Sequence, residues 1–204
     1  MHTPLLYTAL GDSLTIGNGT YFSAGFVDRY AYKLSSQYQC HVITRLHAKP
    51  KLTSTELLLM AEQPDVIEDI ANAKIITITI GGNDLIQANK DYKKSDDPQV
   101  FRKALALFHK NIQLLIDHIR NIKGADNYII QVVGLYNPLP DLAHSESWVQ
   151  RFNSTLQLME SRKVSYIDIY KPFDFYKNKV RSGIHPNGRG YQIIANRLEE
   201  KNII

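Results

Sequence analysis

The sequence LLYTALGDSLT, residues 5–15, predicts a strand that ends in a tight turn before a helix. The apolar run Leu5–Leu10 has the length of a buried strand, and a glycine follows it directly. Gly11 permits a sharp turn of the backbone, which would place Ser13 at the end of the strand and near the start of the helix. We therefore expect the chain to open with a strand–turn–helix unit that carries a serine hydroxyl at its turn.

The remainder of the chain repeats this order of strand and helix. The segment Ile75–Ile80, rich in β-branched residues, predicts the clearest strand. The segment Pro98–Ile122 predicts the longest helix, because its apolar residues recur at intervals of three and four. Loops are expected over the charged run Lys90–Asp97 and from the last strand to Gly190. Further strands are expected at residues 40–44, 128–133 and 164–169, and further helices at residues 23–37, 53–60, 64–71, 146–160 and 191–200.

Strands that alternate with helices predict one parallel sheet joined by right-handed crossovers. The expected fold class is therefore α/β: a three-layer α/β/α sandwich with a central five-stranded parallel sheet, similar to flavodoxin. A length of 204 residues suits one domain, and neither a linker nor an internal repeat divides it. We expect a single domain over residues 1–204.

The composition excludes several classes of protein. Hydrophobic residues make up 44% of the chain and charged residues 22%, which is typical of globular proteins and excludes disordered and collagen-like ones. The net charge of +4 is spread along the chain without a basic stripe, so we expect no nucleic-acid partner. No apolar run has the length of a membrane span and no basic segment opens the chain, so we expect neither stable membrane insertion nor a signal peptide. A cytoplasmic protein is the simplest interpretation, and the oligomeric state stays open.

Polar residues and glycines follow the predicted strands at their carboxyl ends, where open parallel sheets bind ligands. The sequence GGND, residues 81–84, follows the third expected strand, and HPN, residues 185–187, lies in the last loop. A serine needs a base to become nucleophilic, and His185 can supply it when the last loop folds back over the same edge. Taken singly, Ser13 could be only a helix cap and His185 only a surface residue. Their combination with Asn83 favours a catalytic site.

Three motifs in this order resemble those of the SGNH (GDSL) hydrolase family: GDSLT at residues 11–15, GGND at residues 81–84 and HPN at residues 185–187. The resemblance covers essentially the whole chain. It extends to bacterial GDSL-type lipases and acylhydrolases, including spore-germination lipases. It implies a serine esterase that acts on a small-molecule or lipid ester and requires neither a metal nor an organic cofactor. The narrower resemblance would imply a spore-associated location.

The resemblance also assigns roles to residues of the motifs. Ser13 would attack the acyl carbonyl, and His185 would take its proton. The oxyanion would be held by the backbone N–H of Ser13, the side-chain amide of Asn83 and a backbone N–H in the loop after the second strand. Residues beside these donors are expected to hold them in place or to complete the site, and two further residues are expected to line the substrate pocket. The residues beside the donors are Asp12, Gly81, Gly82 and Asp84. The expected pocket residues are Tyr136 and Asn137.

Two positions depart from the family pattern. Lys51 stands where the family has a glycine whose N–H is the third oxyanion donor. Either the Lys51 N–H replaces this donor, or the loop takes another path and leaves Lys51 exposed. Ser182 stands where the family has the acid that orients the histidine. Ser182 Oγ, a main-chain carbonyl or the carboxylate of Asp174 could accept the His185 Nδ1 hydrogen instead.

Two functions therefore remain open. The intact Ser13, Asn83 and His185 favour a serine acylhydrolase that forms an acyl-enzyme. The residues at Lys51 and Ser182 favour a catalytically impaired binding protein that keeps the fold and the pocket. Oxyanion stabilisation and substrate binding sustain much catalysis without the acid, so we expect the enzyme.

Overall fold

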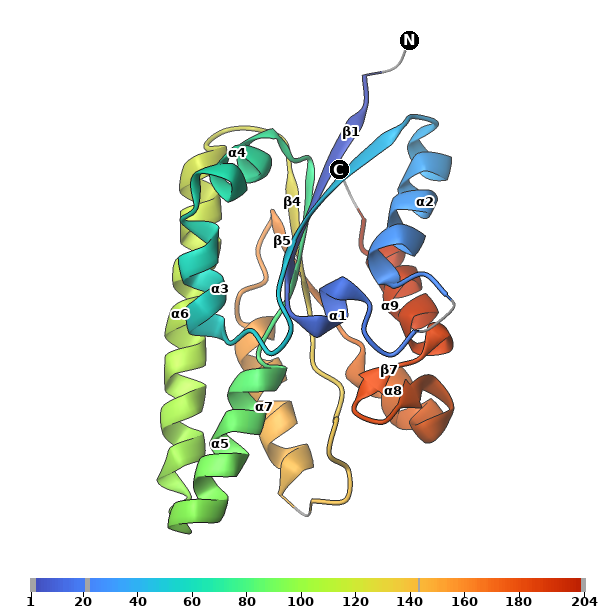
Figure 1. Ribbon diagram of the computed structural model, residues 1–204. Helices are drawn as coiled ribbons and strands as arrows, with labels where there is room; N and C mark the ends of the chain where they lie inside the picture. The colour runs from blue at the N-terminus through green and yellow to red at the C-terminus, as the bar shows by residue number, and fades with distance from the viewer. Residues whose placement is uncertain (1–2, 21–22, 143, 203–204) are drawn as a thin grey trace.

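The backbone folds around a five-stranded parallel sheet, in a computed structural model that describes residues 3–20, 23–142 and 144–202 (Figure 1). The strands are β1 (Leu5–Gly11), β2 (Val42–Ala48), β3 (Ile75–Thr79), β4 (Ile129–Val133) and β5 (Val164–Ile167). They lie in the order β2-β1-β3-β4-β5, which is the flavodoxin-like order. The predicted α/β fold with a five-stranded parallel sheet is therefore confirmed.

Helices cover both faces of the sheet and complete the three layers. They are α1 (Ser13–Ile16), α2 (Phe26–Tyr38), α3 (Ser54–Ala61), α4 (Pro64–Asn72), α5 (Gly82–Ser95), α6 (Gln99–Lys123), α7 (Ser145–Gln157), α8 (Tyr170–Tyr176) and α9 (Gly188–Glu200), with the short 3₁₀ helix η1 (Lys177–Val180). As Figure 1 shows, α3 to α7 lie on one side of the sheet, and α2 and α9 lie on the other.

The strands contribute apolar side chains to both faces because successive residues point to opposite sides. In β3, Ile75 packs with the cluster under α2 and α9, whereas Ile76 packs with the cluster under α6. Ile129 and Ile130 of β4 divide in the same way. Both faces of the sheet are therefore buried, as is usual for parallel sheets covered by crossover helices.

The longest helix, α6, packs its predicted apolar stripe onto the sheet. Phe108, Ile112, Leu115 and Ile119 are each no more than 2% exposed. Burial of one such side chain contributes about 1.5–3 kcal/mol to the free energy of unfolding. Because α5 packs along α6, this anchorage also fixes the helix that carries Asn83.

Two segments expected as loops form regular structure instead. Residues 90–95 belong to α5, because Ala88 and Tyr92 continue its apolar face while the lysines of this run are exposed. The segment after β5 forms α8, η1 and a two-stranded hairpin of β6 (Arg181–Ser182) and β7 (His185–Pro186). Each of these elements is too short to show a periodic apolar pattern in the sequence.

The register of the sheet brings the carboxyl ends of three strands level. Gly11 at the end of β1 pairs with Thr79 at the end of β3, and Thr79 pairs with Val133 at the end of β4. The loops that follow these strands therefore leave the sheet along one edge. The strand order reverses between β1 and β3, and ligands bind at such switch points in open α/β sheets.

Residues 1–2 and 203–204 of the expected domain lie outside the described ranges, and the division of the chain into domains stays a prediction. Among the residues that are described, no helix combines the length and the apolar character that crossing a lipid bilayer requires.

Candidate active site

Ser13 lies on the turn that joins β1 to α1, and Gly11 makes this turn possible. Gly11 has a φ of +151°, and a Cβ atom there would lie 2.4 Å from the Thr79 carbonyl oxygen, so only glycine fits. Asp12 caps α1, because its Oδ1 accepts a hydrogen bond from Leu14 N at 3.0 Å. Ser13 is thus the first residue of the helix and not its cap, and its side chain forms part of a cavity wall.

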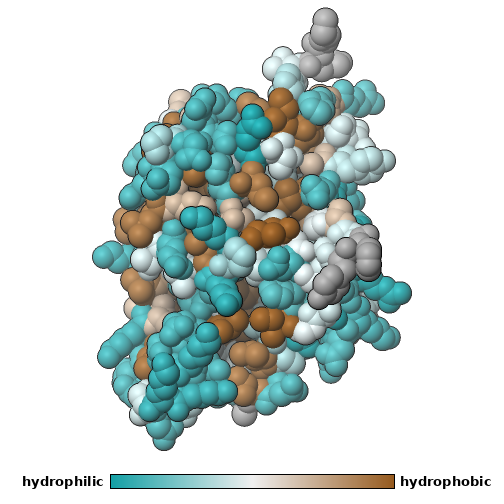
Figure 2. Space-filling view, viewed as in Figure 1, coloured by the Kyte–Doolittle hydropathy of each residue, from teal (hydrophilic) through white to brown (hydrophobic). Residues whose placement is uncertain are grey.

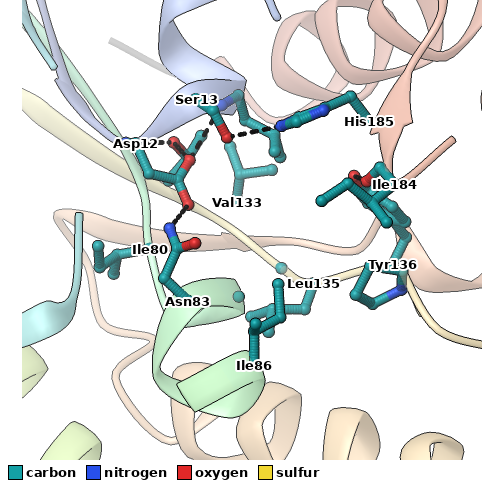
Figure 3. Close-up of a pocket in the computed structure, with 15 residues that line it drawn as sticks. Asp12, Ser13, Ile80, Asn83, Ile86, Val133, Leu135, Tyr136, Ile184 and His185 are labelled. Carbon is teal, nitrogen blue, oxygen red and sulfur yellow. Dashed lines mark hydrogen bonds between the residues drawn. The ribbon is translucent and has the colours of Figure 1, made fainter. Parts of the chain in front are cut away.

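His185 approaches Ser13 from the other end of the chain. Ser13 Oγ lies 3.0 Å from His185 Nε2, and Figure 3 marks this hydrogen bond. The β6–β7 hairpin carries His185, and the loop after α1 packs closely against it: a Cβ atom at Gly19 would lie 2.8 Å from His185 Cβ. Partial burial lowers the pKa of His185. The neutral imidazole, which can accept the serine hydrogen, is therefore favoured.

Asn83 faces the same region from the first turn of α5. Its Nδ2 donates a hydrogen bond to the Leu52 carbonyl at 2.9 Å and another to Asp12 Oδ2 at 3.3 Å. The shorter bond fixes the amide to the loop after β2. The longer one, drawn in Figure 3, directs the second amide hydrogen toward the turn that carries Ser13.

The Asp12 carboxylate joins the loops after β1 and β3. Besides capping α1, it accepts hydrogen bonds from Thr79 Oγ1 at 3.1 Å and from the Asn83 amide. Asp12 is only 4% exposed, and this burial raises its pKa to about 6. A buried carboxylate with several donors is held in one geometry. Asp12 therefore links the turn that carries Ser13 to Thr79 and to the Asn83 amide.

Asp84 supports a different part of this edge. Its carboxylate accepts hydrogen bonds from the backbone N–H of Ser54, at 3.0 Å, and from the Ser54 hydroxyl. Ser54 Oγ in turn accepts a hydrogen bond from Asn111 of α6 at 3.0 Å. Asp84 therefore ties the start of α5 to the start of α3, next to the loop that presents the Leu52 carbonyl to Asn83.

An apolar cavity of about 60 Å³ opens beside Ser13 and His185. Figure 2 shows apolar residues gathered around a hollow on this face of the molecule. Its polar wall carries Asp12, Ser13, Asn83 and His185. Its apolar walls include Ile80, Ile86, Val133, Leu135, Tyr136 and Ile184. The cavity can therefore hold a short apolar group with a polar end directed at the Ser13 hydroxyl.

The remaining residues predicted for the site take different places. Gly81 is the N-cap of α5, and Gly82 and Tyr136 line the cavity. The Tyr136 hydroxyl donates a hydrogen bond to the Ile184 carbonyl, which ties the loop after β4 to the hairpin. Asn137 lies outside this cavity but lines the larger cleft beside it. Its side chain donates a hydrogen bond to Ser145 Oγ and accepts one from Leu139 N.

The two departures from the family pattern both lie at exposed positions. Lys51 lies outside the cavity lining and has a φ of 62°, in the left-handed region that favours glycine. Ser182 lies opposite His185 in the β6–β7 pairing. Within the described ranges, neither Ser182 nor Asp174 hydrogen-bonds to His185, and the imidazole bonds only to Ser13. Among the residues that the structure describes, His185 therefore has no carboxylate partner.

Several residues of the site were missed by the sequence analysis. Thr79 meets Asp12 only because β1 and β3 pair, which no local pattern reveals. Ile86 lies one helical turn after Asn83, and this spacing could have placed it on the cavity side of α5. Ile184 lines the cavity directly before the histidine of the HPN motif.

Known proteins resemble this chain along almost its entire length. The sequence profile described as the GDSL-like Lipase/Acylhydrolase family matches residues 9–193. The chain is 37% identical over 200 residues to the spore germination lipase LipC of Bacillus licheniformis. The aligned region covers 95% of this chain and 94% of that protein.

Solved structures show the same relationship. The lipase Lip_vut3 from a goat rumen metagenome superposes with a TM-score of 0.91 at 37% identity, over 96% of each chain. A GDSL-like lipase described as putative, from Parabacteroides merdae, shares the fold with a TM-score of 0.73 at 17% identity, over 96% of this chain and 94% of its own. The resemblance drawn from the three motifs is thereby confirmed, and the chain belongs to the GDSL-like lipase/acylhydrolase family of ester hydrolases.

Proposed function

We propose that the protein hydrolyses carboxylic esters through a covalent acyl-enzyme on Ser13. The observation that carries this proposal is the 3.0 Å separation of Ser13 Oγ and His185 Nε2 at the wall of an apolar cavity. A serine hydroxyl bonded to a neutral imidazole can lose its proton as it attacks a carbonyl carbon. The substrate class is a small-molecule or lipid ester.

The reaction proceeds in two halves. In the first, Ser13 Oγ forms a bond to the acyl carbon while its proton passes to His185 Nε2. The bond to the alkoxy group then breaks, and His185 returns the proton to the leaving oxygen. In the second half, water attacks the acyl-enzyme and gives a proton to His185. The bond between Ser13 Oγ and the acyl carbon then breaks, and His185 returns that proton to Ser13 Oγ as the carboxylic acid is released.

The oxyanion of each tetrahedral intermediate is held by the Ser13 N–H and the Asn83 amide. The Ser13 N–H lies in the first turn of α1, where backbone donors lack partners within the helix. Asn83 Nδ2 lies 3.3 Å from Asp12 Oδ2, and the hydrogen that it donates there turns to the oxyanion. The hydrogen bond to the Leu52 carbonyl keeps the amide in place. Each preorganised donor of this kind contributes about 3–4 kcal/mol to the transition state.

The cavity volume sets an expectation for the acyl chain. A volume of about 60 Å³ holds roughly four to six water-sized groups. A series of p-nitrophenyl esters of graded length should therefore give the highest kcat/KM near butyrate and hexanoate. Longer acyl chains would have to leave the cavity. A flat profile would contradict the expectation that this cavity holds the acyl chain, and no hydrolysis of any ester above the buffer rate would contradict the proposed function.

A catalytically impaired binding protein is the second candidate. It is favoured by the absence, within the described ranges, of a carboxylate bonded to His185. An imidazolium without such a partner is stabilised less in the transition state, so turnover would suffer while binding in the cavity persists. We give it less weight because the Ser13–His185 hydrogen bond is formed.

Ser182→Asp tests whether the missing carboxylate limits turnover. Position 182 lies across the hairpin from His185, and side chains of directly opposed residues lie close together. The new carboxylate should raise kcat on a short ester by about 10-fold, a small part of the ~10⁴ that a triad acid contributes. It should also raise the pKa of His185, which moves the acid limb of kcat/KM to higher pH.

Ser182→Ala is the matched control and should leave kcat and the pH profile unchanged. Wild-type behaviour of both variants would show that another group already orients the histidine. A fall in kcat for the alanine variant alone would show that the Ser182 hydroxyl has that role.

The similarity to a spore germination lipase supports the proposal that this protein acts in spores. A role of this chain in spores is tested by following a tagged copy through spore purification and germination. Recovery of the tagged protein only from vegetative cells would contradict this role.

A further inference from the structure

The segment Lys171–Ile184 exposes several large apolar side chains. Phe175 is 78% exposed, the highest value among the large hydrophobic residues that the structure describes, and Tyr176 and Ile184 are each 46% exposed. The rings of Phe175 and Tyr176 pack edge to face, 4.9 Å apart. Phe173 is buried and lies two positions before Phe175, so Phe175 projects from the opposite side of α8. Exposed apolar side chains that lie together and are rimmed by polar residues are typical of surfaces that contact a partner.

Basic residues flank these apolar side chains in the sequence. Residues 171–181 include Lys171, Lys177, Lys179 and Arg181 but a single acid, Asp174. This stretch therefore has a net charge of +3. Residues 171–181 are therefore a basic stretch that also carries exposed aromatic side chains. A partner for this surface must accept apolar rings and carry negative charge.

The same segment forms one side of the entrance to the active site. Ile184 lines both the catalytic cavity and a larger cleft beside it, and Lys177 and Arg181 also line that cleft. Figure 1 shows α8 and β7 together at the end of the molecule where α1 lies. A partner bound to this segment would therefore lie next to the entrance of the cavity.

We propose that Lys171–Ile184 is a docking surface for a lipid bilayer that contains anionic headgroups. Lysines near such a surface are attracted by its negative potential, and aromatic rings are stable at the boundary between headgroups and acyl chains. A second copy of this chain fits less well, because its equivalent surface has the same positive charge. The proposal concerns binding, and it can hold or fail independently of ester hydrolysis.

The test is cosedimentation of the full chain with vesicles of phosphatidylcholine, with or without phosphatidylglycerol. The wild type should bind the vesicles that contain phosphatidylglycerol and be released by salt. Phe175→Ala/Tyr176→Ala and, separately, Lys171→Gln/Lys179→Gln should each lower the partition coefficient by about 10-fold or more. All variants should hydrolyse soluble p-nitrophenyl butyrate at the wild-type rate, which separates a failure of docking from a failure of the proposed activity.

Two matched control variants carry substitutions near the amino-terminal ends of the strands, at the other end of the sheet from Lys171–Ile184. Leu158 is 74% exposed and lies between α7 and β5, and Lys74 and Arg162 precede β3 and β5. Leu158→Ala and Lys74→Gln/Arg162→Gln should leave vesicle binding unchanged. The proposal is overturned when the wild type does not bind anionic vesicles, when the control variants lose as much binding as the test variants, or when Phe175→Ala/Tyr176→Ala changes only the oligomeric state.

Discussion

Replacement of Ser13 by alanine is expected to lower kcat for a short p-nitrophenyl ester by about 10⁴–10⁶, with KM almost unchanged. In the proposed reaction the hydroxyl supplies the atom that bonds to the acyl carbon, and the alanine side chain cannot replace it. KM should stay near its wild-type value because the apolar walls of the cavity, which hold the acyl group, are not altered. Steady-state kinetics over a range of ester concentrations measures both constants.

An exposed serine provides the control for this substitution. Ser36→Ala, on the exposed side of α2, should keep the wild-type kcat. Thermal unfolding of Ser13→Ala should match the wild type, which excludes loss of folded protein as the cause. A well-folded Ser13→Ala protein with substantial residual turnover would place the nucleophile elsewhere.

Asn83→Ala is expected to lower kcat by about 10²–10³ while KM changes little. The amide contributes mainly when negative charge develops on the carbonyl oxygen, so its loss affects the transition state more than the bound ester. The same substitution removes the bonds to the Leu52 carbonyl and to Asp12. Thermal unfolding therefore has to accompany the kinetics, and activity is compared at a temperature where both proteins are fully folded.

The pattern of kinetic constants distinguishes two roles of Asn83. A large rise in KM at constant kcat would mean that the amide binds the substrate in its ground state. A fall in kcat alone supports its role as an oxyanion donor.

The arrangement of the sheet could be predicted because its signals are local and repeated. Apolar runs of strand length alternate with helical patterns, and the carboxyl ends of parallel strands meet at one edge. This reasoning brings Ser13 and Asn83 to the same edge without knowledge of any side-chain contact. The roles of the site residues stay predictions until they are measured.

The features that could not be predicted depend on contacts between distant parts of the chain. β2 extends to Ala48, beyond its expected end, because it pairs with β1 along its whole length. The left-handed conformation of Lys51 is not indicated by its residue type, because lysine rarely adopts it; the only hint is the glycine that the family has at this position. The acceptors of the Asn83 amide come from Leu52 and Asp12, on two other loops.

The central claim, that Ser13 is the nucleophile activated by His185, is tested most directly by covalent labelling. A fluorophosphonate reacts with an activated serine hydroxyl and leaves an adduct that peptide mass spectrometry assigns to a residue. The account predicts an adduct on the peptide that contains Ser13, strongly reduced in His185→Ala and lost in Ser13→Ala. An adduct on another serine, or no adduct in a well-folded wild-type protein, would contradict it.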